Sequence, residues 1–269
     1  MRIFVFEEEH PSYDVIAKAA ELPFPTTIFL AAHDLADFCY DRERFRRARP
    51  GYHQYVYWPT PLTNSVPAKE WISLFSSPEQ LEKIGEELKL WHKLDYGAML
   101  DLELPVKLWP ILKGLRHFWN NKRRLAEMVS LTKETDRQIY TAEYPALGPK
   151  TKWLMEAFGI SYPTAKHGHI RISMFYSSML DDFSKKLRID LWKRAARELE
   201  RQASLDSNLH VGLGVTMPAN LLGSQSVLSP EDLRRDLFFL RRIGVKTAII
   251  YRLAGMTDKH IAACQKFVD

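Results

Sequence analysis

The chain has 269 residues, 46% of them hydrophobic and 12% aromatic, which is enough to bury one sizeable core. It carries 38 basic and 33 acidic residues, for a formal net charge of +5. No apolar run approaches the length that crosses a bilayer, and no proline-, glycine- or serine-rich linker divides the chain. The composition argues against a membrane-spanning protein and predicts one domain over residues 1–269.

Eight apolar, β-branched or aromatic runs alternate with amphipathic segments along the whole chain. This alternation is typical of βα units around a parallel sheet, and eight units are what a single (β/α)8 TIM barrel needs. A doubly wound open sheet is the alternative, but a closed barrel leaves no edge strand to protect. The predicted strands are Ile3–Glu7, Thr27–Ala32, Gln54–Trp58, Gly97–Glu103, Gln138–Glu143, Ile170–Tyr176, His210–Met217 and Thr247–Leu253.

Two of the intervening helices have clear start signals. Ser77-Pro78-Glu79 and Ser229-Pro230-Glu231 each place a hydroxyl at the N-cap, proline at the first helical position and an acid in the first turn. Gly244 is expected to end the second of these helices, and Asp182–Leu205 predicts a longer helix of the same amphipathic kind.

In a (β/α)8 barrel the reactive groups gather at the C-terminal ends of the strands, so the predicted strand ends select the candidate site residues. Acids and aromatics dominate the selection. In chain order the selected residues are Glu7, Glu8, Glu9, His33, Asp34, Trp58, Asp101, Glu103, Glu143, Tyr144, Tyr176, Met217, Asn220, Tyr251 and Arg252.

Asp101 and Glu103 are the most informative of these residues. Side chains on a strand alternate between its faces, so these two carboxylates share one face while Leu100 and Leu102 share the other. Buried carboxylates that lack partners change their pKa, which makes such a pair a candidate for acid/base work. The alternative is that one acid pairs with an arginine and the other is solvated.

Two carboxylates around a central cavity predict cleavage of a glycosidic bond, because one can protonate the leaving oxygen while the other stabilises a cation or activates water. Glu103 and Asp101 are the first catalytic candidates, and Glu143 or Glu7 could supply the second carboxylate instead. The expected substrate contacts are Glu7, Trp58, Tyr144, Tyr176, Tyr251 and Arg252, whose aromatic members offer flat faces to sugar rings.

Two short motifs carry a family resemblance. Asp101-Leu-Glu103 at the fourth strand and Met174-Phe-Tyr176 at the sixth resemble the strand ends of chitinase-like barrels of glycoside hydrolase family 18 and their relatives. The resemblance implies that Glu103 is the general acid, that Asp101 orients it and shares its proton, and that Tyr176 holds the reacting group of the sugar.

The sequence departs from that family at several positions. Gly97, Ala98 and Met99 stand where the family has further aspartates, Ser177 follows the sixth-strand tyrosine in place of aspartate, and Tyr251 stands where a tryptophan is usual. The third strand also lacks a Ser-x-Gly-Gly motif. These departures put substrate-assisted cleavage in doubt.

Two other functions stay open. A metal-dependent isomerase or hydrolase barrel would hold a divalent cation with His33, Asp34, Glu103 and Glu143. A non-catalytic barrel would bind RNA or an acidic partner through the basic segments Asp37–Arg49 and Trp119–Arg124, with interleaved Phe38, Tyr40 and Phe45. Acids accompany each basic cluster, which favours solvated helix faces instead.

The remaining expectations concern the compartment and the partners. The chain opens directly into a strand at Arg2–Phe6, and its two cysteines, Cys39 and Cys264, form neither a zinc motif nor a disulfide framework. We therefore expect a cytoplasmic protein without a metal or other cofactor. Its expected partner is a carbohydrate or other small-molecule substrate, and neither nucleic acid nor a membrane.

Overall fold

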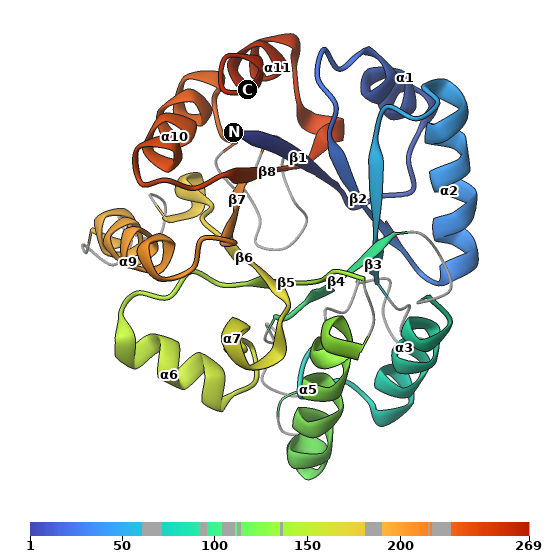
Figure 1. Cartoon of the computed structure of the whole chain (residues 1–269), viewed down its shortest axis with the longest axis vertical. Coiled ribbons are helices and arrows are strands. Elements are labelled where there is room, and N and C mark those ends of the chain that lie inside the picture. Colours follow the sequence, from blue (N-terminus) through green and yellow to red (C-terminus); the bar gives the residue numbers. More distant parts are fainter. Residues whose placement is uncertain are drawn as a thin grey trace.

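The computed structural model describes residues 1–60, 72–91, 96–103, 111, 114–134, 137–180, 190–214, 216 and 227–268. Eight parallel strands form a closed barrel in sequence order, with β8 pairing back onto β1 (Figure 1). This confirms the (β/α)8 barrel and excludes the open sheet. The strands are β1 Arg2–Glu7, β2 Thr27–Ala32, β3 Gln54–Pro59, β4 Gly97–Asp101, β5 Ile139–Glu143, β6 Ile170–Met174, β7 His210–Gly214 and β8 Thr247–Tyr251.

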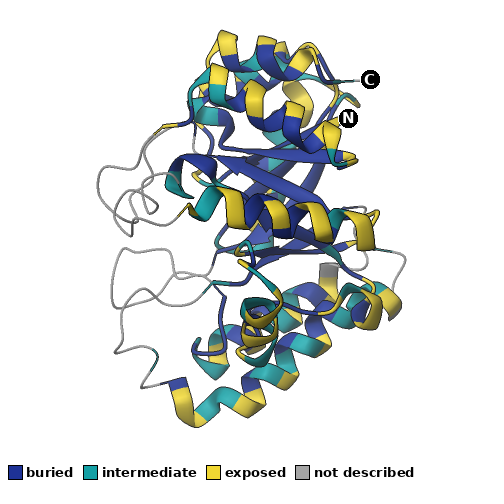
Figure 2. Cartoon of the chain, turned by 90° about the vertical axis from the view of Figure 1, so that its left-hand side faces the viewer, coloured by how far each residue is buried: buried dark blue, intermediate teal, exposed yellow. Residues whose placement is uncertain are grey.

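Helices surround the barrel as an outer ring, with buried faces toward the strands and exposed faces outward (Figures 1 and 2). Short 3-10 helices η1 Leu115–His117 and η2 Leu253–Gly255 precede α5 and α11. The α-helices with described bounds are α1 Tyr13–Glu21, α2 Leu35–Ala48, α3 Pro78–Trp91, α5 Phe118–Glu134, α6 Pro149–Ala157, α7 Thr164–His167, α9 Leu191–Leu205, α10 Pro230–Arg242 and α11 Asp258–Gln265.

The predicted helix signals act as expected at α3 and α10. The Ser77 hydroxyl accepts a hydrogen bond from the backbone N–H of Gln80 at 3.2 Å, and the Ser229 hydroxyl accepts one from Asp232 at 3.1 Å. Gly244 adopts φ +83° after α10, the left-handed conformation that ends many helices. The helix predicted over Asp182–Leu205 begins only at Leu191, because Asp190 has a non-helical backbone and its carboxylate caps the helix by accepting the Lys193 N–H at 2.8 Å. Residues 181–189 lie outside the described part.

Several strands are shorter than predicted. β4 ends at Asp101 and not at Glu103, while β6 and β8 each end two residues before the predicted Tyr176 and Leu253. The apolar and aromatic composition continues past the last pair of the ladder, where the chain already turns toward the next helix. At β6 this turn is visible as a hydrogen bond from the Leu180 N–H to the Tyr176 carbonyl.

Two buried layers follow from the alternation of side chains along each strand. The inner layer fills the barrel with residues such as Phe6, Trp58 and Met99, whereas residues such as Val5 and Leu100 pack between the strands and the helices. The face on which a strand-end residue stands therefore decides whether it reaches the barrel mouth, by which we mean the rim formed by the C-terminal strand ends. Within the described segments, no helix is long and apolar enough to cross a membrane.

Candidate active site at the barrel mouth

The end of β4 places Asp101 and Glu103 at the barrel mouth. Asp101 stands on the inner face with Met99, and only 5% of it is exposed, while Leu100 and Leu102 pack in the outer layer. The backbone N–H of Glu103 donates to the Ile72 carbonyl at 3.3 Å, which fixes the chain just beyond the strand. The two acids therefore lie together, as their spacing predicts.

Burial and mutual repulsion hold protons on this pair. Burial raises the pKa of Asp101 well above its usual range, and the charges of Glu103 and Glu8 add to that shift. Burial also raises the pKa of Glu103 to about 7, although a hydrogen bond from Tyr144 opposes the shift. Among the described residues, nothing hydrogen-bonds the buried Oδ1 of Asp101. The pair thus retains a proton near neutral pH, which is the state a general acid needs.

Three tyrosines surround the pair. Tyr144 hydrogen-bonds Glu103 from the end of β5, and the ring of Tyr176 lies 5.8 Å from that of Tyr251, centroid to centroid. Burial and the charges of Asp101 and Glu103 raise the pKa of Tyr176, so its phenol stays protonated. The tyrosines offer hydroxyl donors and ring faces at the same place as the acids.

Glu8 is a third carboxylate at the mouth; the sequence analysis selects it as a strand-end residue but assigns it no catalytic or substrate-binding role. Its Oε2 accepts a hydrogen bond from the Tyr251 hydroxyl and lies 3.9 Å from the Arg252 guanidinium, which also contacts Glu9 at 2.9 Å. Glu8 follows Phe4 and Phe6 at the spacing of two that marks the inner face of β1. That parity is the sequence signal that could have placed Glu8, and not Glu7, at the mouth.

Glu7 stands on the opposite face of β1 from the one that reaches the mouth. Its Oε2 accepts a hydrogen bond from the Ala254 N–H at 2.8 Å, and its Oε1 accepts one from the Glu9 N–H at 3.4 Å. Glu7 shares its face with Val5, which packs in the outer layer. The structure thus uses Glu7 to fasten the segment after β8 and does not bring it beside Asp101 and Glu103.

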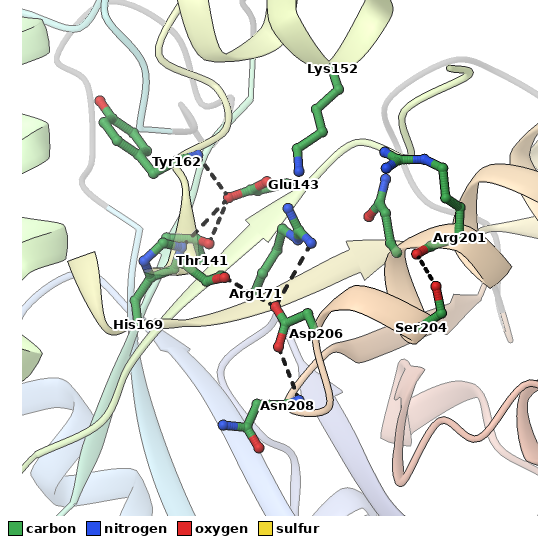
Figure 3. A network of polar contacts seen from close by, with 12 residues as sticks. Thr141, Glu143, Lys152, Tyr162, His169, Arg171, Arg201, Ser204, Asp206 and Asn208 are labelled. Atoms are coloured by element: carbon green, nitrogen blue, oxygen red, sulfur yellow. Dashed lines mark hydrogen bonds and ion pairs between the residues drawn. The ribbon is translucent and has the colours of Figure 1, made fainter. Parts of the chain in front are cut away.

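Glu143 lies in a separate buried cluster on the outer face of β5 and β6 (Figure 3). Its Oε1 accepts hydrogen bonds from the Thr141 hydroxyl at 2.8 Å and from the Tyr162 N–H at 3.3 Å. Arg171 opposes the rise that burial causes in the pKa of Glu143, and it also lies 3.8 Å from Asp206. The cavity here is about 10 Å³, room for one water molecule and not for a sugar.

The other predicted contacts are divided between the core and the rim. Trp58 is buried in the inner layer, with its ring 5.6 Å from that of Phe6, so it forms part of the barrel filling. Tyr251 and Arg252 lie at the mouth, where both side chains contact the Glu8 carboxylate. Met217 and Asn220 lie outside the described residues.

The residues of the metal alternative are used separately. The His33 ring contacts the Thr60 carbonyl at 2.9 Å, and the Asp34 carboxylate caps α2 by accepting the Asp37 N–H at 2.9 Å. Glu143 points to the outer cluster. In the part of the chain that is described, no three histidine, cysteine or acidic side chains are placed to hold a metal ion together.

Asp37–Arg49, the first of the two basic segments predicted for a non-catalytic barrel, differs from the prediction, whereas Trp119 in the second segment is 78% exposed. Phe38 and Phe45 are fully buried under α2, because they belong to its apolar face. Arg46 and Arg47 both donate to Glu43, at 2.7 and 3.1 Å. Of the three aromatic side chains predicted to interleave with the arginines of this segment, only Tyr40 is therefore exposed.

Comparison with known proteins relates the chain to solved structures only. No family profile matches it, and no curated protein matches its sequence. A family 18 chitinase from Pseudoalteromonas aurantia superposes with a TM-score of 0.60 at 10% identity, over 100% of both chains. A class V chitinase from Nicotiana tobaccum gives 0.59 at 11% identity, over 100% of this chain and 99% of that one. A D-tagatose 3-epimerase-like protein gives 0.55 at 14% identity, over 99% and 95%. These similarities establish a shared barrel fold.

Proposed function

We propose that this protein cleaves a glycosidic bond at the barrel mouth, with Glu103 as the general acid and Asp101 as the group that orients it and shares its proton. The observation that carries the proposal is the pair itself, in which Asp101 is buried, Glu103 is half-buried and the pKa of Glu103 is raised to about 7. A carboxyl group with such a pKa is protonated in a large fraction of molecules at neutral pH and can give its proton to a leaving oxygen.

The neighbouring groups fit the remaining steps. As the bond between the anomeric carbon and the leaving oxygen breaks, Glu103 supplies the proton and positive charge develops on the sugar. Glu8 is the best-placed further carboxylate to stabilise that charge or to activate water, because Glu7 and Glu143 face away from the mouth. Tyr144 and Tyr176 supply hydroxyls beside the acids.

The sequence resemblance and the solved structures with the same fold suggest a class of substrate and not a particular sugar. Chitinases share the fold, so chito-oligosaccharides are the first substrates to try. Ser177 and Met99 stand where the family has aspartates, so the proposal does not depend on participation by an acetamido group of the substrate. Substrates without that group therefore belong in the same panel.

The test is turnover of aryl glycosides and oligosaccharides by the parent protein, Glu103→Gln and a matched control. Glutamine keeps the shape of Glu103 but removes its proton, so we expect turnover to fall by about a hundredfold or more. Glu127→Gln makes the same chemical change at a side chain that is 67% exposed on α5, and it should leave turnover unchanged. Full activity in Glu103→Gln would show that Glu103 is structural.

A further inference from the structure

The outer faces of α5 and α6 carry a concentration of exposed apolar side chains. Thirteen large apolar side chains are exposed in the described part of the chain, and five of them lie in residues 115–124 and 149–158. Trp119 is 78% exposed and Trp153 is 68% exposed. Side chains of this size are normally scattered singly over a surface, so the clustering indicates a binding face.

The two helices meet at the N-terminal turn of α5 and the C-terminal end of α6. The Phe118 and Phe158 rings lie 6.4 Å apart, and the Lys122 ammonium donates to the Ala157 carbonyl at 2.7 Å. The same ammonium lies 5.9 Å from the centroid of the Trp119 ring. Trp119 and Phe158 therefore belong to one continuous surface, although 38 positions in the sequence separate the two helix ends.

Helical spacing assigns the other members of this surface. On α6, Leu154 and Lys150 precede Phe158 at intervals of four and so share its side of the helix. Lys152 and Glu156 lie on the other side, where they pair at 3.9 Å. We name the surface formed by Trp119, Lys122, Lys150, Leu154 and Phe158 the α5–α6 patch.

The patch carries two lysines and lies within two segments that are rich in basic residues. Residues 115–124 and 149–158 hold six lysines and arginines and one acid, a formal charge of +5. The net charge of the whole chain has the same value. Three of these cations have acidic partners: Arg123 pairs with Glu127 at 3.7 Å, Arg124 pairs with Glu82 on α3 at 3.8 Å, and Lys152 pairs with Glu156 at 3.9 Å. Lys122 and Lys150 have no acidic partner among the residues described. The Lys122 ammonium donates one hydrogen bond to Ala157 and keeps two further donors, so both lysines can still bind anions.

The patch adjoins the sector of the barrel that carries the candidate site. α5 follows β4, whose end presents Asp101 and Glu103, and α6 begins five residues after Tyr144, which hydrogen-bonds Glu103. Aromatic rings pack against the flat apolar faces of sugar rings, and ammonium groups attract carboxylates or sulfates. An occupant that reaches both the mouth and the patch would be a chain of sugars that carries negative charge.

We propose that the α5–α6 patch binds the extended part of an acidic polysaccharide whose glycosidic bond lies at the barrel mouth. The proposal rests on the function proposed above and specifies its substrate class. It assigns Trp119 and Phe158 as ring platforms, and Lys122 and Lys150 as the cations that select acidic over neutral chains.

The test measures binding without turnover, by affinity electrophoresis of the full chain in gels that contain polygalacturonate or neutral dextran. The parent protein and Glu103→Gln should both be retarded by polygalacturonate, less at high salt, and not by dextran. Trp119→Ala and Lys150→Gln should each weaken the binding by about tenfold, the value of one stacked ring or one paired charge. Both side chains are exposed, so the folded state should tolerate these changes.

Phe238→Ala is the matched control, because Phe238 is 64% exposed on α10, across the ring of helices from α5 (Figure 1). Equal effects of Trp119→Ala and Phe238→Ala, or equal retardation by dextran, would overturn the proposal. So would binding to anionic phospholipid vesicles that depends on Trp119 while polygalacturonate does not bind. Patch-dependent retardation in a parent protein that cleaves no glycan would support the patch and count against the glycosidase function alone.

Discussion

Replacing Glu103 with glutamine should stabilise the protein at alkaline pH. In the unfolded chain this carboxyl titrates near 4.5, whereas burial raises its pKa to about 7 in the folded protein. A raised acid pKa means that the folded state holds the proton more tightly, so its contribution to stability is present below 4.5 and is lost as the pH rises to 7. At ~1.4 kcal/mol per pKa unit, the loss is on the order of 3 kcal/mol. Glutamine cannot ionise, so the Glu103→Gln variant does not lose this stability.

The assay is urea unfolding of the parent, Glu103→Gln and Glu127→Gln at pH 5 and pH 8. The stability difference between Glu103→Gln and the parent should become more favourable by about 2.5 kcal/mol between these two pH values, because a small part of the loss has already occurred at pH 5. Part of this gain also reflects Asp101, whose pKa the charge of Glu103 helps to raise. Glu127→Gln should show no such change. An equal difference at both pH values would refute the claim that the folded protein holds the proton of Glu103 more tightly than the unfolded chain does.

Three further predictions concern other parts of the chain. Glu8→Gln removes a negative charge that raises the pKa of Glu103, so the alkaline limb of the activity profile should move to lower pH. Glu9→Gln should leave that limb in place, although Glu9 also contacts Arg252. A shift of the limb in both variants would contradict the prediction. Arg171→Met should lower the free energy of unfolding by about 3 kcal/mol or more, because it leaves the buried Glu143 and the half-buried Asp206 without their cation. A loss below about 1 kcal/mol in urea unfolding would be inconsistent with that role. Ser229→Ala should cost about 1 kcal/mol through loss of the N-cap of α10, and unchanged thermal unfolding would show that the cap contributes nothing.

The fold could be predicted because its signals are local. The βα units are marked one after another by the recurring apolar runs and, at α3 and α10, by a serine-proline-acid helix start. The strands of these units pair in the same order to close the barrel. The positions at which the strands end were harder to predict from the sequence. At β4, Leu102 continues the apolar run beyond Asp101 because it packs in the outer layer, so composition alone does not mark where the ladder ends.

The site was harder to predict because a barrel strand is buried on both faces. Inner and outer positions are then both apolar, and the sequence does not show which acid at a strand end faces the mouth. Asp101 and Glu103 were selected together because they share a face. Glu7 and Glu143 were selected by their position at a strand end, but both stand on outer faces, and Glu8 takes the place at the mouth.

The most direct test of the proton-donor role compares two leaving groups. An oligosaccharide needs its leaving oxygen protonated, whereas a dinitrophenyl glycoside of the same sugar releases a stable anion without help from an acid. If Glu103 is the general acid, Glu103→Gln should slow bond cleavage in the oligosaccharide by about a hundredfold or more and leave cleavage of the dinitrophenyl glycoside nearly unchanged. Equal slowing of both substrates would contradict the account, because it would mean that Glu103 supports the site without donating the proton.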